Sequence, residues 1–381
     1  MSTARRFALV CPNYYPRTCG VGDHSMRLAE ELSRRGFEAA VFTRGPAEPN
    51  PAAPTVPVTG VSGPLPLVVA ARIRRELERF APTDLIIQYT PQMFDAWRWG
   101  SAATLWLALE ARRKRVNVVV LAHELFLSWS TRPDLAVGAA LLRAQFATIA
   151  KLADHVLVTV DARAHRVAGW LRAAGVKPTV GVVRVGSPAV PVARSAPPAD
   201  LHLGTFSTLG VGKRFDVVLD CFKLVLAQRP GAQLTLLGDF GQPGDTRRNE
   251  LEQAVASHPG RDRIRLLGRQ PLSVIAQEVA DLDVFLFPMN TGANTRSSTL
   301  PLALGSALPV VATNGAETDD IFVDGHNVVF AGALQGDSFA AATLRIANDP
   351  ALGKRVSQGA AALYRDHLSW QRIGDRLLAQ I

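Results

Sequence analysis

Cysteine is scarce in this chain. Three cysteines occur among 381 residues, at positions 11, 19 and 221, so their number is odd and their spacing is wide. A disulfide scaffold needs a dense, even set of cysteines, and a zinc site needs closely spaced Cys or His ligands. Neither pattern is present. We therefore expect reduced thiols in a cytoplasmic protein and no bound metal.

Long apolar runs are also missing. No uninterrupted apolar segment approaches the ~20 residues of a membrane-spanning helix. The chain opens with the basic stretch MSTARR, but the apolar segment after it, FALVC, is too short for the core of a signal peptide. The 48% hydrophobic content is enough for two cores in a soluble globular protein.

Acidic residues are sparse in the first half. Residues 1–190 carry 24 Lys and Arg against 14 Asp and Glu, a net charge of +10, whereas residues 191–381 carry 18 against 19, a net charge of −1. A basic half suggests an anionic partner: a nucleic acid, a membrane surface or a phosphorylated substrate. The excess of Arg over Lys also fits a compositional bias, and both interpretations stay open. The cations are not interleaved with aromatics as in a nucleic-acid-binding module, so no nucleic acid is expected.

Strands and helices alternate along the first half. Short β-branched runs predict buried strands, and apolar residues at helical spacing lie between them. The expected strands cover residues 7–11, 38–43, 85–89, 116–121 and 155–160. This alternation predicts a doubly wound parallel sheet of the Rossmann type.

The first loop carries a glycine motif. Gly20-Val21-Gly22 directly precedes the first predicted helix, with Asp23 as the expected cap, and its glycines permit a ligand to approach the backbone closely. A lone Gly-x-Gly is weak evidence for a dinucleotide site. Because Thr43, not an acidic residue, closes the second strand, binding of NAD is disfavoured.

His123 and Glu124 follow another strand directly. Isolated histidines are usually structural. This one lies where a parallel strand ends, beside a carboxylate, and that edge is where open α/β sheets bind ligands. We therefore interpret both residues as candidates for a site.

A second alternating series follows a proline-rich segment. Residues 188–200 (PAVPVARSAPPAD) hold four prolines and are the best candidate for a linker. Further strands are expected at residues 201–206, 233–237, 263–267 and 284–288. The predicted organisation is an N-terminal domain at residues 1–187, a C-terminal domain at residues 201–362, and a terminal amphipathic helix at residues 363–381 that crosses back to the first domain.

The stretch GANTRSSTLPLALGSALPVVAT combines a loop, a short helix and a strand. Pro301 is tolerated only in the first turn of a helix, so the helix must begin just before it. Ser297, Ser298 and Thr299 then lie at the helix N-terminus beside Arg296. Hydroxyls, free amides and a cation would together bind a phosphate or diphosphate. The alternative is that one serine merely caps the helix.

Two such domains facing each other would enclose a cleft. Glycine turns and cations from both sides would line it: residues 20–22 from the first domain, and Lys213, Arg214 and residues 296–299 from the second. A nucleoside diphosphate fits this chemistry. The cations would neutralise a leaving diphosphate, which is the charge that develops in glycosyl transfer.

In order and spacing, these motifs resemble a GT-B glycosyltransferase similar to glycosyltransferase family 4, over nearly the full chain. The motifs that carry the resemblance are PNYYPRTCGVGD with RRGFEAAVFT, His123, GTFSTLGVGKRFD, LTLLGDFG, RIRLLGRQPLSVIAQEVADLDVFLFP, LALGSALPVVAT with GAETDDIFVDGHN, and the terminal LSWQRIGDRL. The resemblance implies GT-B architecture, that is, two Rossmann-like domains with an interdomain cleft.

The resemblance also implies residue roles. The C-terminal domain would bind a nucleotide-sugar donor, UDP- or GDP-linked, and the N-terminal domain an acceptor, which is a small molecule, a glycan or a lipid-linked molecule. Lys213 matches the basic residue for the diphosphate, and His123 matches the histidine turned toward the donor sugar. The other implied site residues are Glu124, Gly20, Val21, Gly22, Gly238, Asp239, Gly268, Arg269, Gln270, Asn294, Ser297, Ser298 and Thr299.

The chain departs from the family pattern at three positions. Thr205 stands where a second arginine is usual, and Arg214 is expected to substitute for it. Asn294 and Leu302 stand where the family carries Glu-x7-Glu. Asn294 can still hydrogen-bond a sugar hydroxyl. Leu302 cannot hold the ribose, so another residue does so or the nucleotide sits differently.

The resemblance further implies a retaining transfer without a metal. Lys213, Arg214, Arg296 and the backbone of residues 297–299 would stabilise the leaving diphosphate, and Glu124 would align His123 or the acceptor. Two alternatives remain: a sugar-nucleotide epimerase of the same fold, and a non-catalytic nucleotide-sugar binder. Asp281-Leu282-Asp283 mimics the motif of metal-dependent transferases but leads into a strand, so turn chemistry is expected there. The cluster RRKR at residues 112–115 gives peripheral contact with an anionic membrane as a minority hypothesis.

Overall fold

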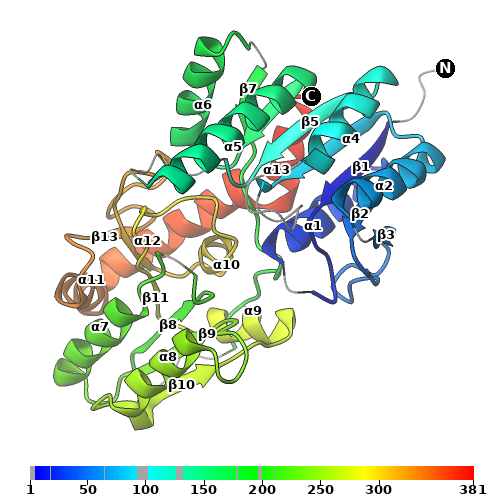
Figure 1. Cartoon of the computed structure of the whole chain (residues 1–381). Coiled ribbons are helices and arrows are strands. Elements are labelled where there is room, and N and C mark those ends of the chain that lie inside the picture. Colours follow the sequence, from blue (N-terminus) through cyan, green and yellow to red (C-terminus); the bar gives the residue numbers. More distant parts are fainter. Residues whose placement is uncertain are drawn as a thin grey trace. The chain divides into compact units, whose positions relative to one another are not determined.

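The chain forms two compact units, described here from a computed structural model (Figure 1). The structure describes residues 5–17, 19–63, 65–91, 102–125, 132–176, 179–195, 200–210 and 212–381. Unit 1 comprises Met1–Arg184 and Trp370–Ile381, and unit 2 comprises Val185–Ser369. The predicted linker at residues 188–200 falls in unit 2, and its residues 196–199 lie outside the described part of the chain.

Unit 1 is built on a seven-stranded sheet with the order β3-β2-β1-β4-β5-β6-β7, and neighbouring strands run parallel. The strands are β1 (Arg6–Cys11), β2 (Glu38–Arg44), β3 (Val58–Val61), β4 (Asp84–Tyr89), β5 (Asn117–Ala122), β6 (His155–Val158) and β7 (Thr179–Val182). The central strands are continuous buried runs such as LIIQY and NVVVLA, which is typical of a parallel sheet covered on both faces.

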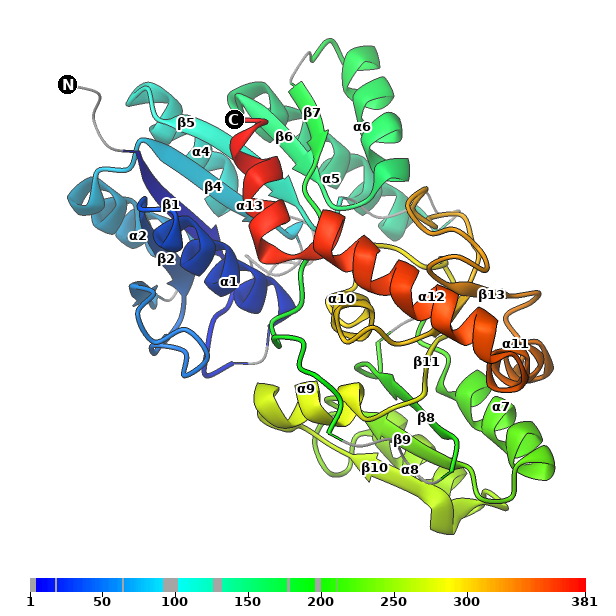
Figure 2. The same cartoon turned by 180° about the vertical axis from the view of Figure 1, so that it is seen from behind.

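Helices cover both faces of this sheet. One core contains residues of α2 (Pro66–Phe80), α4 (Ala102–Arg113), α5 (Pro133–Leu152) and α6 (Asp161–Ala173). The core on the opposite face contains residues of α1 (Gly20–Arg34) and of α13 (Trp370–Leu378). Figure 2 shows α13, in red, beside α1, so the end of the chain completes the helix layer that its beginning starts.

Unit 2 repeats the plan with six parallel strands in the order β10-β9-β8-β11-β12-β13. They are β8 (His202–Phe206), β9 (Gln233–Leu237), β10 (Ile264–Leu267), β11 (Val284–Phe287), β12 (Val310–Thr313) and β13 (Val329–Ala331). The helices are α7 (Phe215–Gln228), α8 (Thr246–Ala256), α9 (Leu272–Ala280), α10 (Leu300–Gly305), α11 (Gly336–Asn348) and α12 (Pro350–Leu363). Residues of α7, α8 and α11 fill one core, and residues of α9 and α10 fill the other.

The two sheets share one topological feature. In each, the first strand of the unit lies between the second and the fourth, so β1 neighbours β4 and β8 neighbours β11. The strand order reverses at these pairs. Ligands of open α/β sheets bind beyond the carboxyl ends of the strands at such switch points.

Two helix ends differ from the sequence prediction. Helix α1 begins at Gly20 itself, and Asp23 lies in its first turn instead of capping it. The cap is Cys19, whose Sγ accepts a hydrogen bond from the Gly22 amide at 3.4 Å. At the other end of the chain, the predicted helix at residues 363–381 is interrupted, because a π-helical turn (Tyr364–Leu368) and the extended residue Ser369 separate α12 from α13.

No membrane span is predicted from the sequence, yet helix α5 contains a segment long and apolar enough for one. Its stretch Leu135–Leu152 has the length and composition of a spanning helix, and a third of it is buried in the fold. Leu142, Phe146 and Ile149 on its inner side lie in the core of unit 1. A helix that covers a sheet passes the same test of length and composition, so this is weak evidence for a span.

Candidate functional site

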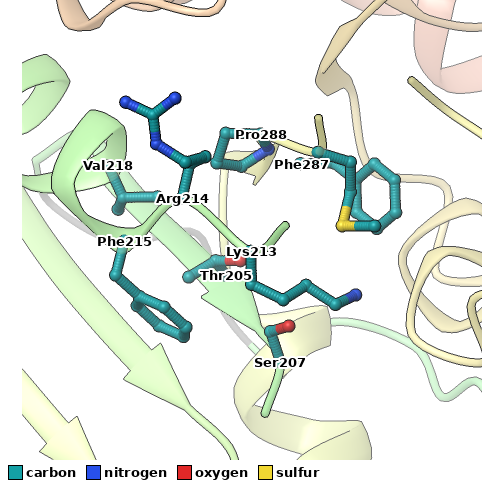
Figure 3. A pocket seen from close by; sticks show the side chains of 9 residues that line it. Thr205, Ser207, Lys213, Arg214, Phe215, Val218, Phe287 and Pro288 are labelled. Atoms are coloured by element: carbon teal, nitrogen blue, oxygen red, sulfur yellow. The ribbon is translucent and has the colours of Figure 1, made fainter. Parts of the chain in front are cut away.

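In unit 2, a small pocket lies where β8 and β11 end, beside the start of α7 (Figure 3). Its volume is about 10 Å³, which is room for about one water molecule. The lining residues are Thr205, Ser207, Lys213, Arg214, Phe215, Val218, Phe287, Pro288 and Met289. The pocket thus lies at the switch point of this sheet and contains two of the predicted site residues, Lys213 and Arg214.

Lys213 is held firmly in this pocket. Its backbone forms an isolated bridge with Met289, and its Nζ lies 5.5 Å from the centre of the Phe287 ring. Burial, and secondly the positive charge of Arg296, lower the pKa of Lys213 to about 8. Lys213 and Arg296 are far apart in the sequence, yet they lie within electrostatic reach of each other. Two neighbouring cations cost free energy, and a bound anion would relieve that cost.

Arg214 does not share this arrangement. Its Nε and Nη2 donate to the carboxylate of Asp216, two residues later, and that pairing raises the pKa of Arg214. In Figure 3 its guanidinium points away from the ammonium of Lys213. Arg214 therefore lines the pocket without contributing a second cation beside Lys213. Thr205 and Arg214 line the same pocket, and the substitution of Arg214 for the arginine missing at Thr205 stays a prediction.

The turn after β9 requires its glycine. Gly238 has φ +148°, and a Cβ there would lie 1.6 Å from the carbonyl oxygen of Ser207. This close approach brings the ends of β8 and β9 together at the pocket. Asp239 accepts a hydrogen bond from the Gly241 amide at 3.0 Å, so its carboxylate stabilises the turn. Beyond β10, Gly268 and Arg269 are exposed and Gln270 is half-buried.

The loop before α10 is fixed by two buried polar residues. The backbone N–H and the hydroxyl of Thr295 both donate to Asp319 Oδ2 at 2.6 Å, and Asp319 is 1% exposed. Asn294 accepts from the Arg296 amide at 3.3 Å and donates to the Gly292 carbonyl at 3.1 Å. These bonds place the backbone from which the Arg296 side chain extends.

The helix start near Pro301 is confirmed, since α10 begins at Leu300. The predicted convergence of free amides at residues 297–299 is wrong for Ser297 and Thr299, and the amides of the two preceding residues are bonded as well. Thr295 donates to Asp319, Arg296 to the Asn294 side chain, Ser297 to the Asn294 carbonyl at 3.4 Å, and Thr299 to the Ser297 hydroxyl at 3.4 Å. The loop is tight enough to satisfy its own donors. Helix α10 is also short, with six residues, so its dipole is weak. Binding of an anion here would depend mainly on the cations Lys213 and Arg296.

Core packing explains why position 302 holds a leucine where the family pattern has a glutamate. Leu302 is fully buried and lies in the same core as Leu300 and Leu304. A carboxylate there would be buried among apolar side chains at high cost. Leu302 therefore contacts the core and has no surface to offer a ligand.

In unit 1, the glycine motif is a point of close backbone contact. A Cβ on Gly22 would lie 2.5 Å from the Asn13 carbonyl oxygen, so only glycine fits there. Gly20 differs, because a Cβ on it would meet nothing within 4 Å. Val21 is half-buried between them. The motif thus packs the first loop onto α1 through Gly22 and leaves open space at Gly20.

His123 lies directly after β5, at the switch-point edge of unit 1. Its Nε2 is 2.6 Å from Gln88 Oε1, and its carbonyl oxygen accepts a hydrogen bond from Arg163 Nη1 at 3.1 Å. Burial, and secondly the charge of Arg163, lower the pKa of His123 to about 4. The imidazole is therefore neutral at pH 7. Glu124 is exposed, and one of its carboxylate oxygens lies 3.8 Å from Arg163.

A second histidine packs against the first. The rings of His24, from α1, and His123 are 5.0 Å apart between centroids and inclined at 76°. Burial and the neighbouring His123 hold the pKa of His24 well below its usual value. The sequence predicts no site role for His24 or Arg163, and for Asp319 it predicts only the start of a helix or turn. Their partners lie 24 or more residues away, and nothing in the local pattern indicates such pairings.

Two other cavities contain none of the predicted residues. One of about 260 Å³ lies between α2 and α4 and is lined mainly by apolar side chains such as Leu77 and Leu107. The other, of about 400 Å³, lies beside α9. In the described part of the chain, no group of three or more His, Cys, Asp or Glu is arranged to hold a metal ion.

Comparisons with protein families match both units. The model described as "Glycosyltransferase Family 4" matches residues 18–193, and the model described as "Glycosyl transferases group 1" matches residues 200–349. The two matches leave out only the chain termini and the residues between them. A search of curated proteins gives no match.

Solved structures with a similar fold cover nearly the whole chain. Sucrose-phosphate synthase from Thermosynechococcus elongatus is 16% identical, with a TM-score of 0.74 and coverage of 99% of this chain and 98% of that one. Anabaena HepE, solved with UDP and glucose, is 15% identical, with a TM-score of 0.73 and coverage of 98% of each chain. The pneumococcal O-GlcNAc transferase GtfA, solved with UDP and GlcNAc, is 12% identical, with a TM-score of 0.72 and coverage of 99% and 98%.

Proposed function

We propose that the chain transfers a sugar from a nucleoside-diphosphate sugar. The premise is that it is a glycosyltransferase of the GT-B fold, with a family 4 domain and a group 1 domain. The donor is a UDP-sugar in the first instance, because the structures of HepE and GtfA were solved with UDP. A GDP-sugar is the alternative donor. The acceptor is a hydroxyl-bearing small molecule, glycan or lipid-linked molecule.

One observation carries this proposal: Lys213 lines the pocket at the β8–β11 switch point, and the positive charge of Arg296 acts on it there. Cleavage of a donor glycosidic bond leaves a diphosphate whose negative charge grows in the transition state. Preorganised cations at that position stabilise the transition state more than the ground state. Ser297, Ser298 and Thr299 add hydroxyl groups on the loop that carries Arg296.

The proposed reaction retains configuration and uses no metal. The bond between the sugar carbon and the diphosphate oxygen breaks, and the acceptor oxygen bonds to that carbon from the same side. The acceptor proton passes to the departing diphosphate oxygen. The chain then needs no dedicated base, which suits a neutral His123 that orients the sugar through a hydrogen bond. A stereochemical assay of the product and turnover in the presence of EDTA test these two features.

Donor assignment is tested with a panel of isotopically labelled UDP- and GDP-sugars. Transfer to an acceptor, or slow hydrolysis of one donor without an acceptor, supports the proposed function. Formation of an epimeric donor identifies an epimerase, and binding without turnover identifies a non-catalytic binder. A thermal-shift screen with the same panel, run beside the assay, reports binding independently of turnover.

We further propose that unit 1 contacts anionic lipid at the cytoplasmic face of a membrane. Its helix layer carries exposed cations on RRKR (residues 112–115), and α5 exposes Val137 and Leu141, which are 69% and 43% accessible. Three of these cations pair with Asp154, Glu110 and Glu78. Exposed cations on one helix and exposed apolar side chains on another favour a negatively charged, partly apolar surface. Flotation with vesicles containing phosphatidylglycerol tests this contact. Absence of co-flotation at low salt would rule out this contact with anionic lipid.

A further inference from the structure

The side chain of His123 is held by an unusual partner. Its Nε2 lies 2.6 Å from the Oε1 of Gln88, the fifth residue of β4, and both side chains are buried. A carboxamide oxygen only accepts hydrogen bonds. With the Oε1 of the Gln88 amide facing the ring, the hydrogen in this contact belongs to His123 Nε2, and Nδ1 is left as the acceptor nitrogen of a neutral ring. Among the described residues, Nδ1 makes no hydrogen bond.

Three other elements restrict the same residue. Arg163 of α6 donates to the His123 carbonyl oxygen, which fixes the backbone from which the ring extends. His24 of α1 packs edge-to-face against the ring at 5.0 Å, and Trp370, the first residue of α13, lies 5.2 Å behind His24. The ring of His123 is thus in contact with Gln88 of β4 and His24 of α1, while Arg163 of α6 holds its backbone and Trp370 of α13 packs against His24.

The charged and titratable groups around His123 keep it neutral. Arg163 opposes a second positive charge, His24 is itself buried and uncharged, and Glu124 is exposed and directed to Arg163. Both nitrogens of His24 and the Nε2 of Gln88 are buried without hydrogen-bond partners among the described residues. Buried polar groups left unpaired cost stability and mark sites where another requirement prevails.

We propose that Gln88 is a positioning residue that fixes His123 as the Nε2–H tautomer, with His24 as the wall against which the ring packs. Nδ1 is then the nitrogen that accepts a hydrogen bond from a hydroxyl of the transferred sugar. This last step rests on the proposed function, whereas the tautomer is a property of the free protein. The two parts can therefore fail separately.

The tautomer is measured directly by ¹H–¹⁵N correlation spectra of the histidine side chains at pH 7. The expected spectrum shows His123, assigned by its loss in His123→Ala, with the proton on Nε2 alone. Gln88→Leu fills the same volume without an acceptor, so we expect a mixture of tautomers and a kcat about 10-fold to 100-fold lower, with a smaller change in KM. Thermal melting establishes that the variant is folded.

Gln88→Glu supplies the matched variant. A carboxylate still accepts from Nε2, so the tautomer is retained, but its negative charge raises the pKa of His123. We therefore expect kcat to recover above that raised pKa and the acid limb of the pH–rate profile to move to higher pH. A merely structural role for Gln88 would leave the profile in place and only lower the melting temperature.

Two results would overturn the assignment: a proton on Nδ1 of His123 in the wild-type protein, or an unchanged tautomer in Gln88→Leu. A third result separates the parts. If the tautomer behaves as expected while His123→Ala retains full turnover, the role of His123 in transfer is wrong and the action of Gln88 on the ring stands.

Discussion

The two units place opposite chemistry at the same edge of their sheets, beyond the carboxyl ends of the strands. In unit 1, the residues proposed for the site are two neutral histidines, His24 near the start of α1 and His123 directly after β5. At the β8–β11 switch point of unit 2, they are Lys213 and Arg296. Yet residues 1–190 carry the net charge of +10, and residues 191–381 carry −1. The proposed anion site thus lies in the half of the chain with the lower net charge, so net charge does not predict where it is.

Burial acts alike on both sites and produces different charge states. It lowers the pKa of His123 from 6.5 to about 4 and that of Lys213 from 10.5 to about 8. At pH 7 the histidine has lost its charge and the lysine has kept it. A similar desolvation thus gives one unit a neutral hydrogen-bonding ring and the other a cation that gains from meeting an anion.

The largest expected effect comes from removing the His123 ring of unit 1. His123→Ala should lower kcat about 100-fold, because the sugar loses the group that orients it, and should leave UDP affinity nearly unchanged. Steady-state kinetics and calorimetry of UDP binding measure the two effects. His165→Ala, an exposed histidine on α6, is the control. Equal losses of UDP affinity and turnover would place His123 outside the assigned role.

Acid should destabilise unit 1 through its buried histidines. The unfolded state binds a proton near pH 6.5, and native His123 does so only near pH 4, so stability is full above pH 6.5 and falls as the pH drops toward 4. At pH 5 the expected loss from His123 is about 2 kcal/mol. The measurement is the melting temperature at pH 7 and pH 5.

His24→Phe isolates this effect from the titration of carboxylates. It keeps an aromatic ring beside His123 and removes a second buried base. Its melting temperature should fall less between pH 7 and pH 5 than that of the wild type, whereas the exposed His165→Phe should behave as wild type. Identical pH dependence in all three proteins would mean that the buried pair does not set acid stability.

On the unit 2 side, Lys213→Ala should weaken UDP binding about 10-fold to 100-fold, which corresponds to the loss of one charge-assisted hydrogen bond. Lys223→Ala, an exposed lysine of α7, is the matched control and should leave the dissociation constant unchanged. Calorimetric titration at pH 7 measures both. An unaltered affinity in Lys213→Ala would remove this lysine from the site.

The smallest effect concerns pH on the alkaline side. Lys213 loses its proton near pH 8, so UDP affinity should fall severalfold as the pH rises from 7 to 9. In Lys213→Arg the guanidinium keeps its charge, and this decline should disappear. Titrations at four pH values in each protein give the comparison. A parallel decline in both proteins would assign the effect to another group.

The sequence predicts most of the fold and only part of the site. Buried strand runs and helical spacing are local, so the strands β1, β4 and β8 lie close to the residues expected for them. His123 is predicted as a site residue because it follows a strand end directly, where ligands bind in this architecture. Lys213 is predicted because it lies in the loop between β8 and α7 and matches the family's basic residue.

The remaining site features depend on contacts between distant segments. Gln88 binds a histidine 35 residues later, and Thr295 binds Asp319 24 residues later. The prediction of free amides at residues 297–299 failed for Ser297 and Thr299, because their amides bond within the loop itself, to the Asn294 carbonyl and the Ser297 hydroxyl. Side-chain pairings of this kind follow from packing and carry no periodic signal in the sequence.

The most direct measurement is a crystal structure of the protein with UDP. The account predicts the β-phosphate within about 3 Å of Lys213 Nζ, at the carboxyl ends of β8 and β11, with the Arg296 side chain turned toward the same diphosphate. A diphosphate bound at any other edge, with Lys213 free of contact, would contradict it.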